Sequence, residues 1–176
     1  MDRGYATKHA QEIKRIIFIA SYPPRQCGIA TFTQDLIAGI RLLMPSVECS
    51  VCVMHESDDP RDYPPEVIFQ IKQDNKLSYI KAAAAINLNA KGTIVVVQHE
   101  YGIYGGEWGK YLLTFLKLLR CPVISTMHTI VAEPTKKIRQ VTEGIIKKVT
   151  FSSHSRIVRS SYFCLSTPLL LKKLWS

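Results

Sequence analysis

The ten residues from Gln98 to Glu107 concentrate side chains that can bind a polyhydroxyl ligand. They include His99, Glu100, Tyr101 and Tyr104. An imidazole and a carboxylate hydrogen-bond hydroxyl groups, while tyrosine rings offer flat apolar faces, and sugars present both kinds of surface. The stretch therefore predicts a carbohydrate site. The alternative is structural: His99 donates to a backbone carbonyl and the tyrosines only pack.

A second candidate is the loop Arg25–Thr31, which contains Gly28. It joins a predicted strand to a predicted helix, so free amides at the positive helix end can bind a phosphate. Gly28 would let a ligand approach the backbone with no Cβ in the way. The loop matches neither the G-x-G-x-x-G dinucleotide pattern nor a P-loop ending in Lys-Ser/Thr. A tight turn that merely needs a glycine is the alternative interpretation.

His128 is the third candidate, directly after the apolar segment Pro122–Met127. A single histidine is most often a hydrogen-bonded core residue, and its place at a strand end is what favours a ligand-binding role here. Metal binding by His99, Glu100 and His128 lacks the H-E-x-x-H or paired-cysteine spacing of known metal sites. We therefore predict no metal site.

The elements that must position these residues follow from apolar runs and periodicity. Continuous β-branched runs predict buried strands, and apolar residues repeated every three or four positions predict amphipathic helices. A T-x-x-Q capping box at Thr31 predicts the start of the first helix, with Phe32, Leu36, Ile40 and Leu43 on its inner face. The predicted strands are Arg15–Ser21, Val47–His55, Val67–Ile71, Thr93–Gln98 and Pro122–Met127, and the predicted helices are Thr31–Met44, Leu77–Leu88, Glu107–Arg120 and Pro134–Val149.

Buried strands that alternate with helices indicate an α/β domain, a doubly wound parallel sheet covered on both faces. In such a sheet, ligands bind outside the carboxyl ends of the strands. Gly28, His99 and His128 each follow a predicted strand. We therefore expect these three residues to converge along one edge of the sheet.

Composition sets limits on the function. With 176 residues, 47% hydrophobic and 21% charged, the chain has the proportions of one globular domain. The net charge of +9 is uneven and most basic near the end of the chain, so it gives no reason to expect nucleic-acid binding. The apolar runs fall far short of the roughly 20 residues of a membrane span, and no secretory signal is readable.

The five cysteines form no disulfide framework. Cys49 and Cys52 have the C-x-x-C spacing, but they fall on a predicted strand, where their thiols point to opposite faces. This arrangement suits neither zinc nor a redox pair, and it favours buried, reduced side chains. We expect a cytoplasmic protein.

The predicted helix Pro134–Val149 is basic on the side opposite its apolar face. The cations are Lys136, Lys137, Arg139, Lys147 and Lys148. A solvated surface helix is one interpretation. Weak peripheral contact with an anionic membrane, at the inner membrane face, is the other.

Three motifs resemble the N-terminal half of a group 1 glycosyltransferase of the GT-B fold. They are Ile19–Thr33 (IASYPPRQCGIATFT), Val97–Glu107 (VQHEYGIYGGE), and Ser125–Thr129 (STMHT) leading to Glu133–Thr135. They occur in the family's order and cover roughly residues 14–149. The resemblance implies a Rossmann-like N-terminal domain and a retaining, metal-independent glycosyltransferase reaction. In that reaction, a sugar passes from a nucleotide-diphosphate donor to a hydroxyl acceptor, and no cofactor is used.

The resemblance also implies roles for individual residues. Gly28 and Ile29 would lie beside the donor diphosphate, and His128 would be catalytic, facing the reacting sugar. The acceptor side would be lined by His99, Glu100, Tyr101 and Glu107. Charge stabilisation of the leaving diphosphate would supply much of the rate.

The family's second, C-terminal domain grips most of the nucleotide sugar and carries a Glu-x7-Glu motif, which we do not find in a matching place here. We therefore expect residues 14–160 to form the acceptor-side domain, inactive alone, and residues 161–176 to be an atypical basic tail at an altered or truncated end. One alternative is a non-catalytic remnant that binds sugar or phosphate. Another is a hydrolase that uses Glu100 and Glu107 as paired carboxylates.

Overall fold

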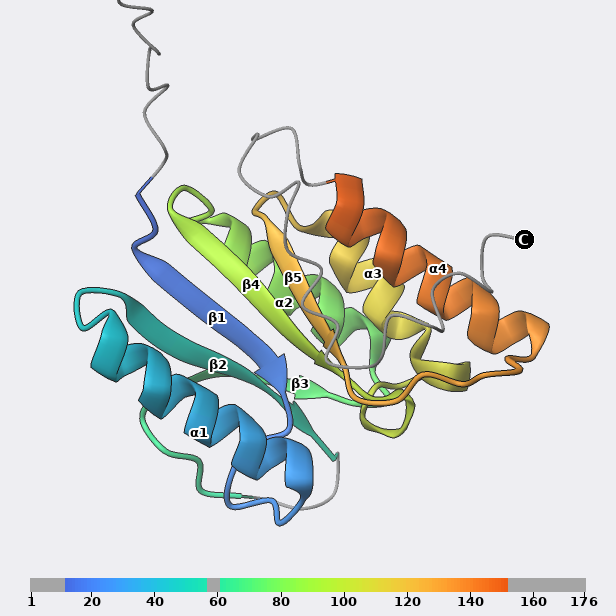
Figure 1. The fold of residues 1–176 in the computed structure, drawn as a ribbon, viewed down its shortest axis with the longest axis horizontal. Helices are drawn as coiled ribbons and strands as arrows, with labels where there is room; N and C mark the ends of the chain where they lie inside the picture. The colour runs from blue at the N-terminus through green and yellow to red at the C-terminus, as the bar shows by residue number, and fades with distance from the viewer. Residues whose placement is uncertain (1–11, 57–60, 152–176) are drawn as a thin grey trace, which may run out of the picture.

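Within residues 12–56 and 61–151, the part of the chain that the computed structural model describes, five parallel strands form one sheet (Figure 1). The strand order is β3-β2-β1-β4-β5. The central strand β1 (Arg15–Ala20) pairs with β2 (Glu48–His55) and β4 (Thr93–His99). The outer strands are β3 (Val67–Lys72) and β5 (Val123–Met127). The predicted parallel sheet is confirmed, and the architecture is Rossmann-like.

Helices cover both faces of this sheet, as a doubly wound fold requires. One face carries α1 (Gly28–Leu43), and the other carries α2 (Lys76–Asn87), α3 (Tyr111–Leu118) and α4 (Lys136–Phe151). Successive β1 residues serve opposite faces: Phe18 packs in the core under α1, whereas Ile17 packs in the larger core under α2, α3 and α4. This two-sided burial explains why the strands read as continuous apolar runs.

The chain changes direction between β1 and β4. From β1 it crosses to β2 through α1, and from β4 it crosses to β5 through α3 on the opposite face. The loops that leave β1 and β4 therefore diverge from neighbouring strand ends. This is the topological switch point at which open α/β sheets bind ligands.

The predicted start of the first helix is wrong. Helix α1 begins at Gly28 with Cys27 as its N-cap, and the N–H of Thr31 already donates to the carbonyl of Cys27 at 3.2 Å. A residue whose amide is bonded within the helix cannot be its cap. The T-x-x-Q pattern therefore lies inside the helix and is no capping box.

The predicted inner face of this helix is also partly wrong. The buried residues are Ala30, Thr33 and Ile37, while Leu43 is 85% exposed. Thr33 can be buried because its hydroxyl donates to the Ile29 carbonyl at 2.7 Å. Leu36 and Ile40 flank the buried stripe and are partly buried.

The helix predicted at Glu107–Arg120 is shorter than expected. Glu107–Gly109 form a 3-10 turn, and α3 begins only at Tyr111. Trp108 and Gly109 have φ angles of 57° and 82°. Residues in this left-handed region cannot continue a right-handed α-helix, so α3 does not extend back through them.

The prediction for the C-x-x-C pair is confirmed. Cys49 and Cys52 are both buried free thiols, one in the core under α1 and the other in the core under α2, α3 and α4. Burial raises the pKa of Cys52 to about 12, so its thiol stays protonated.

The predicted tail at residues 161–176 and the last part of the predicted domain lie outside the described residues. Across residues 12–56 and 61–151, none of the helices has both the length and the apolar character needed to cross a membrane.

Candidate functional site

The candidate site is built from the loops that follow β1, β4 and β5 at the carboxyl edge of the sheet. Parallel pairing brings these three strand ends together, with Ile19 opposite Val97 and His99 opposite Met127. The hydroxyl of Tyr104 lies 3.0 Å from the carbonyl oxygen of Ile19 and 2.9 Å from that of Gln98. It therefore ties the ends of β1 and β4 together at the switch point.

Gly28 and Ile29 form the first turn of α1, directly after the β1 loop. The N-cap Cys27 makes no side-chain hydrogen bond to the amides of this turn. A Cβ at Gly28 would have no atom within 4 Å, and its φ is not left-handed. Neither backbone strain nor packing within the described residues therefore requires a glycine here.

Two arginines lie in the neighbouring loops. Arg25, in the loop that leads to α1, pairs with Glu56 at the end of β2 at 2.9 Å, and Arg61 approaches the same carboxylate at 3.5 Å. The Nη1 atom of Arg25 is buried without a hydrogen-bond partner among the described residues. Arg25 stands in the Ile19–Thr33 motif, although its guanidinium was not among the predicted site residues.

His128 lies immediately after β5 and is exposed. Its Nε2 lies 2.9 Å from Oε1 of Gln98, and its ring meets that of Phe32 edge-on, with centroids 5.2 Å apart. Burial lowers the pKa of His128, and the Glu100 carboxylate acts in the opposite direction. Through Phe32, the structure brings His128 beside the first turns of α1.

Gln98 is the site residue that sequence reasoning missed. Its side chain is 0% exposed, and its Nε2 has no hydrogen-bond partner within the described part of the chain. The available signal was a polar residue at the end of the apolar run Thr93–Val97, a position where a buried amide needs a partner.

His99 lies at the same sheet edge, but its ring turns to the other face. Because strand side chains alternate, Gln98 lies on the α1 face and His99 on the opposite one. The ring stacks on Tyr104 at 5.8 Å and meets Tyr101 edge-on at 4.8 Å. It is 0% exposed, with both nitrogens unpaired among the described residues. Burial lowers the pKa of His99 to about 4.

Within residues 12–56 and 61–151, neither ring nitrogen of His99 has a hydrogen-bond partner, so no donation from His99 to a carbonyl is seen there. The link between His99 and His128 runs through the backbone instead: the N–H of His128 donates to the His99 carbonyl at 2.9 Å.

Glu100 and Tyr101 connect the β4 loop to its neighbours. Glu100 accepts hydrogen bonds from the Tyr101 amide and from the Thr129 hydroxyl, next to His128. The Tyr101 hydroxyl lies 2.7 Å from that of Thr142 on α4. Glu100 thus joins the His128 side of the site, whereas Tyr101 joins the loop to α4.

Glu107 is directed to α4 rather than to the other candidates. Its carboxylate pairs with Lys137 at 2.6 Å, and both side chains are about half exposed or more. Glu100 and Glu107 therefore have separate partners, and the paired-carboxylate hydrolase stays a prediction.

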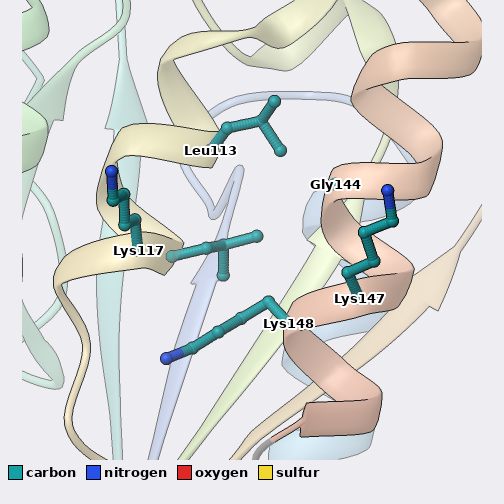
Figure 2. A pocket seen from close by; sticks show the side chains of 6 residues that line it. Leu113, Lys117, Gly144, Lys147 and Lys148 are labelled. Carbon is teal, nitrogen blue, oxygen red and sulfur yellow. The ribbon is translucent and has the colours of Figure 1, made fainter.

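The predicted amphipathic character of the basic helix is confirmed. In α4, Ile138, Val141 and Ile145 are buried, whereas the lysines and arginine are exposed or partly exposed. A groove of about 490 Å³ separates α4 from α3 (Figure 2). It is lined by Leu113, Leu116, Lys117, Gly144, Lys147 and Lys148. None of these residues belongs to the loops of the candidate site, and contact with an anionic membrane stays a prediction.

Among residues 12–56 and 61–151, no three His, Cys, Asp or Glu side chains gather as a metal site would require. Comparisons of the chain with protein-family models, with curated proteins and with solved structures find no match. The class that the fold defines is therefore a Rossmann-like α/β domain with polar residues clustered at its switch point.

Proposed function

We propose that this chain is the acceptor-side domain of a retaining, metal-independent GT-B glycosyltransferase, which transfers a sugar from a nucleotide-diphosphate donor to a hydroxyl acceptor. The observation that carries the proposal is the ring contact between Phe32 and His128. Phe32 follows Gly28 by about one helical turn. The contact therefore supports a site in which the proposed phosphate-binding turn and the residue proposed to face the sugar lie side by side.

The start of α1 supplies the charge that such a reaction needs. When the glycosidic bond to the donor breaks, the diphosphate leaves with negative charge, and unpaired amides at a helix N-terminus stabilise it. The side chain of the N-cap residue Cys27 makes no hydrogen bond to the amides of Gly28 and Ile29 that would compete with a ligand. The guanidinium of Arg25, in the loop that enters this helix, adds a cation.

On the acceptor side, Glu100, Tyr101 and Glu107 remain the proposed contacts, with carboxylates as acceptors for sugar hydroxyls. We assign His99 a packing role behind these acceptor-side residues, because its ring is fully buried. In the family, a second domain holds most of the nucleotide. We therefore expect this chain alone to bind ligand and not to turn it over.

The first experiment tests the phosphate contact with a matched pair of glycine variants. Gly28→Ala and Gly39→Ala both add a methyl group to α1, and neither Cβ would have an atom within 4 Å. Pyrophosphate and nucleotide sugars are titrated into the full chain and followed by amide NMR. We expect shifts at Gly28, Ile29 and His128, and about tenfold weaker pyrophosphate binding in Gly28→Ala, or about 1.4 kcal/mol, because its methyl group enters the ligand's path.

Gly39→Ala should bind pyrophosphate as the parent does, since Gly39 lies in the middle of the helix. Equal affinity of the Gly28→Ala variant and the parent would contradict the proposal, as would shifts that leave α1 unaffected. Sugar transfer by the chain on its own would contradict the expectation that it is half of an active site.

A further inference from the structure

The structure holds the imidazole of His128 from two sides. Its Nε2 lies 2.9 Å from Oε1 of Gln98, and the edge-on ring of Phe32 lies at a centroid distance of 5.2 Å. The backbone is fixed as well, because the His128 N–H continues the ladder to the His99 carbonyl. Few rotations of the ring are compatible with all of these contacts.

Gln98 is itself immobilised. Its side chain is 0% exposed, and its backbone carbonyl oxygen lies 2.9 Å from the Tyr104 hydroxyl. Because the Tyr104 hydroxyl also contacts the Ile19 carbonyl, Gln98 is held in place relative to both β1 and β4. A rigid partner of this kind can define the geometry of an exposed neighbour.

The atoms that meet also define where the proton sits. An amide oxygen only accepts hydrogen bonds, so the contact with Oε1 of Gln98 assigns the hydrogen to Nε2 of His128. In the neutral ring, Nδ1 then carries the lone pair. No hydrogen bond to Nδ1 occurs within the described residues, which leaves this nitrogen available to accept one from a ligand hydroxyl.

We propose that Gln98 is a positioning residue, which fixes the ring orientation and the tautomer of His128 so that Nδ1 faces the bound sugar. This inference rests on the proposed function for the identity of the ligand, although the Gln98–His128 pair can be tested without one. An amide at this position also keeps the ring neutral, because it supplies an acceptor without the negative charge that would hold an imidazolium.

The electrostatic surroundings are compatible with a neutral ring. Glu100 is the carboxylate that favours protonation of His128, whereas partial burial opposes it and prevails. The neighbouring His99 is buried and has a pKa of about 4, so it carries no charge near neutral pH.

The test uses the full chain labelled with ¹⁵N at histidine, in which the ring-nitrogen shifts of His128 report which nitrogen is protonated. The parent should show the Nε2–H tautomer alone. Gln98→Leu removes the acceptor and should give a mixture of tautomers. Gln98→Glu places a carboxylate at the same distance and should raise the titration midpoint of His128 by about 1 pH unit or more.

The exposed Gln70 on β3 gives the matched controls, Gln70→Leu and Gln70→Glu, which should leave the His128 signals unchanged. A parent with mixed or Nδ1–H tautomers would overturn the inference, as would Gln98 variants that titrate like the parent. The proposed function fails differently: the tautomer is fixed as expected, but nucleotide sugars and pyrophosphate do not shift the His128 signals.

Discussion

Individual polar residues at the carboxyl edge of the sheet differ in how many groups depend on them. The Tyr104 hydroxyl serves two buried carbonyls on neighbouring strands, those of Ile19 and Gln98. Among the described residues, the Tyr101 hydroxyl contacts that of Thr142, whose own hydroxyl also donates to the Ile138 carbonyl at 3.0 Å. The first hydroxyl therefore contacts two buried carbonyls, whereas the second contacts a side chain that has another hydrogen-bond partner.

We predict that Tyr104→Phe lowers the free energy of unfolding by about 2 kcal/mol, since two buried carbonyl oxygens lose a hydrogen-bond contact. Tyr101→Phe is the matched control and should cost about 1 kcal/mol or less, because Thr142 keeps its bond to Ile138. Urea unfolding monitored by circular dichroism gives both values. Equal losses of stability in the two variants would show that the Tyr104 contacts with β1 and β4 stabilise the fold no more than the Tyr101 contact does.

The sequence indicated several of the residues at this edge, but not the face of the sheet on which each side chain lies. Gly28, Glu100 and His128 could be named because each follows a recognisable strand. The role of Gln98 depends on pairing with β5, where Gln98 lies opposite Thr126. Such a register is a long-range property that local patterns do not contain. The side to which His99 points was equally hidden, because both faces of β4 are buried.

At the scale of elements, the turn after β4 is the most tightly constrained segment of the candidate site. A Cβ at Gly105 would lie 1.7 Å from the backbone oxygen of Gln73, at the end of β3. By contrast, a Cβ at Gly102 in the same turn would have no atom within 4 Å. The glycine at 105 thus has a packing reason that is independent of any ligand.

Gly105→Ala should therefore destabilise the domain by about 3 kcal/mol or more, because a backbone atom cannot move aside as a flexible side chain can. Gly102→Ala should change the free energy of unfolding by less than about 0.5 kcal/mol. Thermal and urea unfolding of the two variants provide the comparison. A Gly105→Ala protein as stable as its Gly102→Ala counterpart would contradict this close approach.

The existence of the elements was predictable, while some of their ends were not. Apolar runs located every described strand, since each strand has at least one face that is buried or partly buried. The start of α1 was misplaced because a cap depends on backbone geometry at Cys27 rather than on residue type at Thr31. The 3-10 turn at Glu107–Gly109 was missed because the positive φ of Trp108 has no sequence signature.

For the molecule as a whole, alternating strands and helices predicted a parallel sheet, but not its strand order. The outer strands β3 and β5 are more polar and less buried than β1 and β4, but composition does not decide which strand pairs with which. The order places β1 beside β4, and only this neighbour relation brings the start of α1 close to the β4 and β5 loops. Gly28, His99 and His128 all lie at that edge, with the His99 ring on the face opposite Gln98.

The enclosed His99 makes the stability of the whole domain depend on pH. Its pKa falls from the ordinary 6.5 to about 4 in the folded state, because burial opposes the charged ring. Between these values the unfolded chain binds more protons than the folded one, so the free energy of unfolding decreases as the pH falls. At about 1.4 kcal/mol per pH unit, the full effect is roughly 3 kcal/mol.

We therefore expect urea unfolding at pH 7, 5.5 and 4.5 to show a progressive loss of stability, and His99→Leu to remove most of the part due to this histidine. Leucine has a similar volume and cannot titrate, so the comparison uses the slope with pH rather than the absolute stability. Carboxylates that titrate near pH 4 contribute equally to both proteins and cancel in the difference. His128→Gln should change the slope less, because His128 is partly solvated. Parallel pH profiles for the parent and His99→Leu would mean that the ring is protonated, or hydrated, inside the folded domain.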